Sequence, residues 1–127
     1  MDERERESII YNYIAAYNAF DMQGMIKDFH PSIKFENISN EVVDMSISGI
    51  ENFKAQAESA SKLFSSRKQS VRSIKHSGNN SEVEIDYVGT VAIDLPNGLK
   101  KGDTIQLKGK SVFEFEDGRI IQLKDIS

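Results

Sequence analysis

The residues of this chain that could do chemistry are mostly hydroxyl and amide side chains on otherwise apolar faces. Tyr13 and Tyr17 lie four residues apart in SIIYNYIAAYNAFDMQG, residues 8–24. This spacing places both on one face of a helix with Ile10, whereas Tyr11 lies on another face. Hydroxyls on an inward face either hydrogen-bond one another or hold a ligand.

Three more polar side chains fall on apolar strand faces. Asn37 lies two residues after Phe35, and Ser111 lies two residues before Phe113. Tyr87 lies on the apolar side of a third segment in which apolar and polar residues alternate. Alternate positions of a strand share a face, so all three point the same way as their apolar neighbours. Two interpretations stay open: a core network that satisfies itself, or a pocket with an apolar wall and a few placed polar groups.

Two groups could move a proton. Asp125 shares parity with Ile121 and Leu123, which would turn it inward, although its place near the C-terminus favours a solvated acid. His30 precedes Pro31, where it could act as a base or cap a helix end. The chain has two histidines, which do not cluster, and no cysteine, so we expect no metal site.

Composition excludes several classes of protein. The 127 residues fit one domain, residues 1–127, and the net charge of -4 gives no basic footprint for nucleic acid. No apolar run approaches the roughly 18 residues of a membrane span, and the charged start MDERERES does not resemble a signal peptide. We therefore expect a cytoplasmic protein without membrane contact. No phosphate-binding loop or serine-nucleophile motif is present, so no cofactor is expected.

Periodicity predicts helices first and strands afterwards. Helices are expected from Ser8 to Phe20, from Asp21, as the cap, to His30, and from about 50 to 65. Strands are expected at 32–39, 42–48, 70–76, 82–94, 104–116 and 119–126. Helices followed by antiparallel strands predict an α+β domain.

Two glycines predict the shape of the sheet. Gly89 and Gly109 lie inside the two longest predicted strands, where glycine often marks a bend. Two long bent strands make a strongly curved sheet, and helices over its concave face leave room for a cavity.

The segment YNYIAAYNAFDMQGMIKDFHPSIKFEN, residues 11–37, resembles the start of nuclear transport factor 2-like domains. The similarity is nearer to ketosteroid isomerases and SnoaL-like polyketide cyclases, and SGIENF and FEFEDGRI further along add to it. This resemblance implies a cone-shaped, cystatin-like α+β fold. Three N-terminal helices would pack on a strongly curved antiparallel sheet with a pocket at its open end. It also implies a homodimer through the sheet, where Val88, Ala92 and Val112 lie among charges.

The resemblance also assigns possible roles. In ketosteroid isomerases a helix-one tyrosine and a protonated aspartate hold the substrate oxygen, and a second aspartate moves the proton. Tyr13 matches the tyrosine, but Asn37 stands at the base and Ser111 at the protonated acid. An amide does not abstract protons, so isomerisation by that route is not expected. Some SnoaL-like cyclases carry a late catalytic aspartate, and Asp125 matches it by position alone.

The sequence therefore predicts a SnoaL-like small-molecule-binding domain with a pocket for an apolar or carbonyl-containing ligand and no clear catalytic dyad. The predicted ligand-binding residues are Tyr13, Tyr17, Phe35, Asn37, Tyr87, Ser111 and Phe113, and Ile14 and Leu107 are expected in the apolar wall. Two alternatives stay open. One is an isomerase or polyketide cyclase-like enzyme that uses Tyr13 with Asp125 or His30. The other is a dimerisation or scaffold module.

Overall fold

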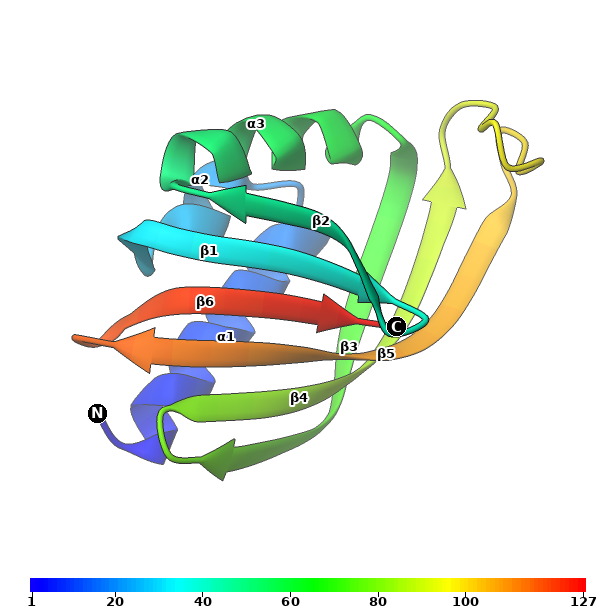
Figure 1. Cartoon of the computed structure of the whole chain (residues 1–127). Coiled ribbons are helices and arrows are strands. Elements are labelled where there is room, and N and C mark those ends of the chain that lie inside the picture. The colour runs from blue at the N-terminus through cyan, green and yellow to red at the C-terminus, as the bar shows by residue number, and fades with distance from the viewer.

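Three helices pack against one face of a curved six-stranded sheet in the computed structural model, which describes residues 1–127 (Figure 1). The elements are α1 (Glu3–Asn18), α2 (Met22–Ile26), β1 (Phe29–Ser39), β2 (Val42–Ser48), α3 (Ile50–Ser61), β3 (Phe64–Ser77), β4 (Asn80–Val91), β5 (Thr104–Glu116) and β6 (Arg119–Ile126). The strand order is β2-β1-β6-β5-β4-β3. All neighbours are antiparallel except β1 and β6, which are parallel. The predicted cone-shaped α+β fold is confirmed, with this one parallel pair added.

Side-chain caps set where the first two helices begin. Asp2 accepts a hydrogen bond from the Glu5 backbone nitrogen at 2.8 Å, so α1 begins five residues before the predicted start. Asp21 accepts one from the Gly24 nitrogen at 3.0 Å and caps α2 as predicted. No helix in the structure is long and apolar enough to cross a membrane.

The predicted end of the second helix at His30 is wrong. The helix ends at Ile26, and the chain enters β1 at Phe29 with Pro31 among the first strand residues. A strand tolerates proline near its first residue, where a missing N–H matters little. His30 therefore belongs to a strand and caps no helix.

The third helix is also shorter than predicted. It ends at Ser61, and Phe64 begins β3. In β3 the register shifts between Val71 and Ser73, which explains why the apolar residues of this segment do not alternate.

A bulge in β6 resets which side chains face inward. Glu114 pairs with Gln122, but Phe115 pairs with Ile120, which leaves Ile121 unpaired between them. Ile120 is consequently in the core with Leu123, and the expected inward face of Ile121 is wrong.

The core lies between α1 and the sheet. Its fully buried side chains include Ile10, Ile33, Val83, Phe113, Ile120 and Leu123. The Tyr13 ring stacks on Phe29 at 5.8 Å between centroids and meets Phe113 edge-on at 5.7 Å. These contacts fix the direction in which the Tyr13 hydroxyl points.

Gly109 lets the end of β6 approach β5 closely. The β4–β5 register runs unbroken through this residue, so Ser111 keeps the same face as Phe113. A Cβ atom at Gly109 would lie 2.7 Å from the Ile126 carbonyl oxygen. Glycine is needed here for space, because a Cβ atom would clash with that carbonyl oxygen.

We predict that Gly109→Ala destabilises the fold by about 1–3 kcal/mol, because the new methyl group must push the end of β6 away. Urea unfolding measures the change. Lys108→Ala, on the exposed side of the same strand, is the matched control and should stay within about 0.5 kcal/mol of the wild type. Equal stability of the two variants would contradict this explanation.

Candidate functional site

One cross-strand row brings three polar side chains together. Asn37 of β1 lies opposite Asp125 of β6, and Asp125 lies opposite Ser111 of β5. Met45 and Val83 continue the row on the two outer sides. Side chains in register share a face, so the three polar groups are neighbours on the face that the helices cover.

A cavity of about 210 Å³ lies between this row and the helices. Nine of its 13 lining residues are hydrophobic, and these come from all three helices and from β1, β2 and β3. Its polar side chains are Tyr13, Tyr17, Asn37, Gln56, Arg67 and Asp125. An apolar wall with a few polar groups is the usual make-up of a site for a small organic molecule.

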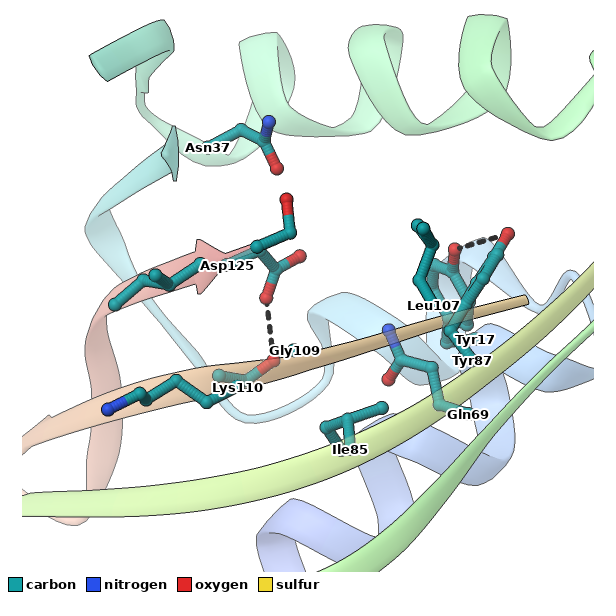
Figure 2. Close-up of a pocket in the computed structure, with 12 residues that line it drawn as sticks. Tyr17, Asn37, Gln69, Ile85, Tyr87, Leu107, Gly109, Lys110 and Asp125 are labelled. Atoms are coloured by element: carbon teal, nitrogen blue, oxygen red, sulfur yellow. Dashed lines mark hydrogen bonds between the residues drawn. The ribbon is translucent and has the colours of Figure 1, made fainter. Parts of the chain in front are cut away.

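A second cavity, of about 160 Å³, adjoins the first and shares Tyr17, Asn37 and Asp125 with it. Figure 2 shows Asn37 and Asp125 on one side of this smaller cavity, and Tyr17 and Tyr87 with Leu107 on the other. Asp125 therefore borders both spaces.

Asp125 is held in a defined position at this junction. Its Oδ1 accepts a hydrogen bond from the Ser111 hydroxyl at 2.7 Å, drawn dashed in Figure 2. Burial raises the pKa of the Asp125 carboxyl to about 6, and the Ser111 hydrogen bond opposes part of that rise. A carboxyl with such a pKa is mostly ionised at neutral pH and can still accept a proton readily.

The expectation that Asp125 is a solvated acid at a fraying terminus is wrong. The end of β6 is tied to β1, because the Ser127 nitrogen donates to the Ile38 carbonyl at 2.9 Å. The Asn40 nitrogen in turn donates to the Ser127 carbonyl at 3.2 Å. The carboxyl is thereby kept at the cavities.

Tyr13 offers a free hydroxyl to the larger cavity. Its ring is buried, and its hydroxyl bonds to no other side chain. Burial, followed by the negative charge of Asp125, raises the pKa of Tyr13 well above its ordinary value. The hydroxyl is therefore protonated at neutral pH and is available as a donor.

Tyr17 and Tyr87 satisfy each other in part. Their hydroxyls lie 3.4 Å apart, and burial raises the pKa of both tyrosines. This pair fits the interpretation of a self-satisfied polar core. The hydrogen bonding of this pair does not include Tyr13, and the Ser111 hydroxyl donates to Asp125 instead.

Asn37 borders both cavities, but its amide nitrogen is engaged outside them. It donates to Asp44 at 2.9 Å and to Ser39 at 3.3 Å. Its amide oxygen remains free to meet a ligand. This oxygen can only accept a hydrogen bond, so the ligand would have to supply the donor.

The family model of the SnoaL-like domain matches residues 10–123. The chain belongs to this family. A comparison with curated proteins finds no match.

Solved structures share the SnoaL-like fold along almost the whole chain. AclR from Streptomyces galilaeus, provisionally described as a hydroxylase, is 21% identical with a TM-score of 0.79, over 98% of this chain and 89% of that one. TerC, co-crystallised with polyporic acid, is 14% identical with a TM-score of 0.78, over 96% and 90%. A protein from Jannaschia sp. CCS1, provisionally described as a SnoaL-like polyketide cyclase, is 15% identical with a TM-score of 0.81, over 97% and 85%. At these identities the likeness shows the fold.

Some predicted residues of the SnoaL-like site lie elsewhere. Phe113 is only 1% exposed and packs behind Tyr13, and Ile14 is also buried in the core. Neither borders a cavity, whereas Phe35 lines the larger one and Leu107 the smaller. The polar predictions therefore meet at the cavities, and two apolar ones belong to the core beneath.

His30 lines neither cavity. Its Nδ1 accepts a hydrogen bond from the Ser32 nitrogen at 3.0 Å near the start of β1. Asn37 is seven residues further along the same strand, which corresponds to roughly 23 Å. His30 lies instead beside the exposed Glu116 and Asp117, where a histidine and two acids come within 4.8 Å of one another. Its side chain belongs to this acidic cluster and does not line the cavity that Tyr13 borders.

Arg67 is a cavity residue that the sequence pattern does not reveal. It lies on β3, is only 6% exposed, and lines the larger cavity. Its Nε donates to the Tyr17 carbonyl oxygen at 2.9 Å. The surrounding stretch SSRKQS has no apolar alternation, so periodicity could not place this side chain inside.

We predict that Asp125→Asn stabilises the SnoaL-like fold at neutral pH. The pKa of Asp125 is raised from 3.8 to about 6, so the folded state binds its proton more tightly than the unfolded state. The resulting loss of stability is absent below about pH 4, develops between pH 4 and 6, and is complete above. The asparagine variant avoids it and should gain about 1–3 kcal/mol at pH 7.5, allowing for some screening by water.

Urea unfolding at pH 4.5 and pH 7.5 measures this gain, which should shrink at the lower pH. Asp117→Asn, in the exposed turn between β5 and β6, is the matched control and should change stability little at either pH. A destabilised Asp125→Asn protein at pH 7.5 would show that the ionised carboxyl supports the fold.

Proposed function

We propose that the protein binds a small, largely apolar carbonyl compound in the larger cavity. We further propose that it is an enzyme, with Asp125 removing a proton from the carbon next to the carbonyl. The observation that carries this proposal is the Asp125 carboxyl. It borders both cavities, accepts a hydrogen bond from Ser111 and has a pKa of about 6. A general base works best when its pKa lies near the working pH.

Tyr13 would stabilise the charge that this step creates. Proton removal beside a carbonyl leaves an enolate, whose negative charge develops on oxygen. The Tyr13 hydroxyl is protonated, lines the same cavity and has no side-chain partner, so it can donate to that oxygen. A donor fixed in a buried site is worth more to such a charge than one in water.

The enolate could then react in two ways. Attack of its carbon on a second carbonyl carbon of the same molecule forms a ring, with the new alkoxide taking a proton from the Asp125 carboxylic acid. Return of the proton to a different carbon isomerises the molecule instead. Membership of the SnoaL-like family and the fold shared with the cyclase-like protein from Jannaschia favour ring closure.

Ligand binding without catalysis is the rival that the sequence favoured. The apolar wall of the larger cavity suits both functions equally, and TerC, which shares the fold, was co-crystallised with polyporic acid. A binding site needs no carboxyl with a pKa near neutrality, however. Asp125 therefore favours an enzyme over a binding protein. The two cavities argue against a scaffold module, which needs no open space.

We predict that the wild type accelerates hydrogen–deuterium exchange next to the carbonyl of 2-tetralone, a bicyclic ketone used as a probe. NMR in D₂O follows the exchange. The rate should rise with pH through an apparent pKa near 6, as Asp125 ionises. Asp125→Asn should lower the rate by about 10²–10⁴-fold, since a positioned base typically contributes that much.

Two further variants, Tyr13→Phe and Asp117→Asn, distinguish loss of the hydroxyl donor from loss of a carboxyl elsewhere on the protein. Tyr13→Phe removes only the donor and should slow exchange by on the order of 10²-fold or more, whereas the exposed Asp117→Asn should leave it unchanged. Exchange at the wild-type rate in Asp125→Asn, or a flat pH profile from 5 to 8, would refute the proposed chemistry.

We also infer a homodimer through the outer face of the sheet, in a cytoplasmic location. Val88 is 42% exposed on β4, and the partly buried Ala92 and Val112 lie on neighbouring segments. Val88 pairs with Gln106, six residues along β5 from Val112, so these apolar residues are spread along the outer face of the sheet, where a second copy of the chain would cover them. Light scattering at micromolar concentration should give twice the mass of the 14.3 kDa chain, and Val88→Lys should lower it. A monomeric wild type would contradict the inference.

A further inference from the structure

We propose that Arg67 binds an anionic oxygen of the ligand, so that the compound in the larger cavity is an acid with an apolar body. The anion would be a carboxylate or an equivalent ionised enol oxygen. This inference rests on the proposed role of the cavity as a ligand site, but not on proton transfer by Asp125.

The hydrogen bonds of Arg67 are incomplete. A guanidinium has five N–H groups, and in Arg67 only the one on Nε has a protein partner, the Tyr17 carbonyl oxygen. Nη2 is buried without any partner. No carboxylate of the protein lies within 4.0 Å of this side chain. A buried charge is normally paired, so the absence of an acid beside Arg67 needs a reason.

Contacts within the protein compensate only part of this burial. The guanidinium carbon lies 3.8 Å from the centroid of the Tyr17 ring and 4.4 Å from that of Phe20. Such cation–π contacts, and the carbonyl at the end of α1, favour a positive charge here. They hold the flat guanidinium in one orientation and leave the N–H groups of Nη1 and Nη2 without a protein partner, on a side chain that lines the larger cavity. A carboxylate or a similar oxygen anion is the group that such a fork pairs with best.

Asp125 does not fill this role, although it borders the same cavity. Tyr13 and Tyr17 experience both charges: Asp125 raises the pKa of each and Arg67 lowers it. No ion pair joins Asp125 to Arg67, so their charged atoms lie more than 4.0 Å apart. An acidic ligand would place its anion at Arg67 and keep it away from the carboxylate of Asp125.

The size of the cavity limits the apolar body. A dry cavity of about 150 Å³ holds one benzene ring, and this one is about 210 Å³ with a second space beside it. One or two fused rings therefore suit it. The probes are 2-naphthoate and 2-naphthamide, which share the ring system and nearly the same shape but differ in charge.

Calorimetric titration at pH 7.5 tests the inference. The wild type should bind 2-naphthoate at least 10-fold more tightly than 2-naphthamide. Arg67→Gln should abolish this preference while still binding the amide, and Arg67→Lys should keep part of it, because the charge remains without the fork. Lys68→Gln removes the same charge from the adjacent exposed position and should leave the preference intact.

Equal affinity of the wild type for both probes would overturn the proposal, and so would failure to bind either. An unchanged preference in Arg67→Gln would overturn it as well. Should Arg67→Gln not fold, the two wild-type affinities and Arg67→Lys decide. Asp125→Asn should keep or strengthen the preference for 2-naphthoate while losing 2-tetralone exchange. Preference without exchange would thus reject the proposed chemistry alone, and exchange without preference would reject the anion site alone.

Discussion

The hydrogen bond from Ser111 to Asp125 is the interaction on which the site depends. Burial of a carboxyl is unfavourable, and its pKa rises accordingly, but one short hydrogen bond offsets part of that effect. The bond forms because β5 and β6 pair in register at these two residues. That pairing requires the end of β6 to lie against β5 at Gly109, where any side chain would meet the Ile126 carbonyl. The absence of a Cβ atom at Gly109 and the register of β5 with β6 thus place the Asp125 carboxyl between the two cavities.

Aromatic packing gives the same site its rigidity. Phe29 contacts both Tyr13 and Phe53, and Phe53 contacts Phe35, so helices α1 and α3 and strand β1 are joined by ring contacts. Tyr13 cannot turn its hydroxyl toward a protein partner without losing these contacts. Its unused donor therefore follows from how the core is filled. The cavity remains because α3 presents small side chains such as Ala57 and Ala60 to it.

Strand alternation predicted the part of the site that depends on local geometry. It placed Asn37 and Ser111 correctly, because their strands run without a register shift from the apolar neighbours that define the face. It failed for Ile121, which lies at a bulge, and it could not show that the parallel pairing of β1 with β6 places Asn37 beside Asp125. Strand alternation did not predict that Arg67 is buried, because its burial depends on the end of α1, 50 residues away in the chain. Tertiary pairing, which no local pattern encodes, decided each of these cases.

The arrangement of charge argues that the cavity serves a ligand. Asp125 and Arg67 carry opposite charges, both are at least partly buried, and both line one cavity, yet they form no ion pair. A fold shaped for stability alone would gain by pairing them or by replacing both with apolar residues. Asp125 and Arg67 instead remain unpaired, and both charges act on the pKa values of Tyr13 and Tyr17. Local departures from good packing and pairing are expected where function requires them. A base, a donor and a cation around one apolar space form a set that only a polar group on a bound molecule would complete.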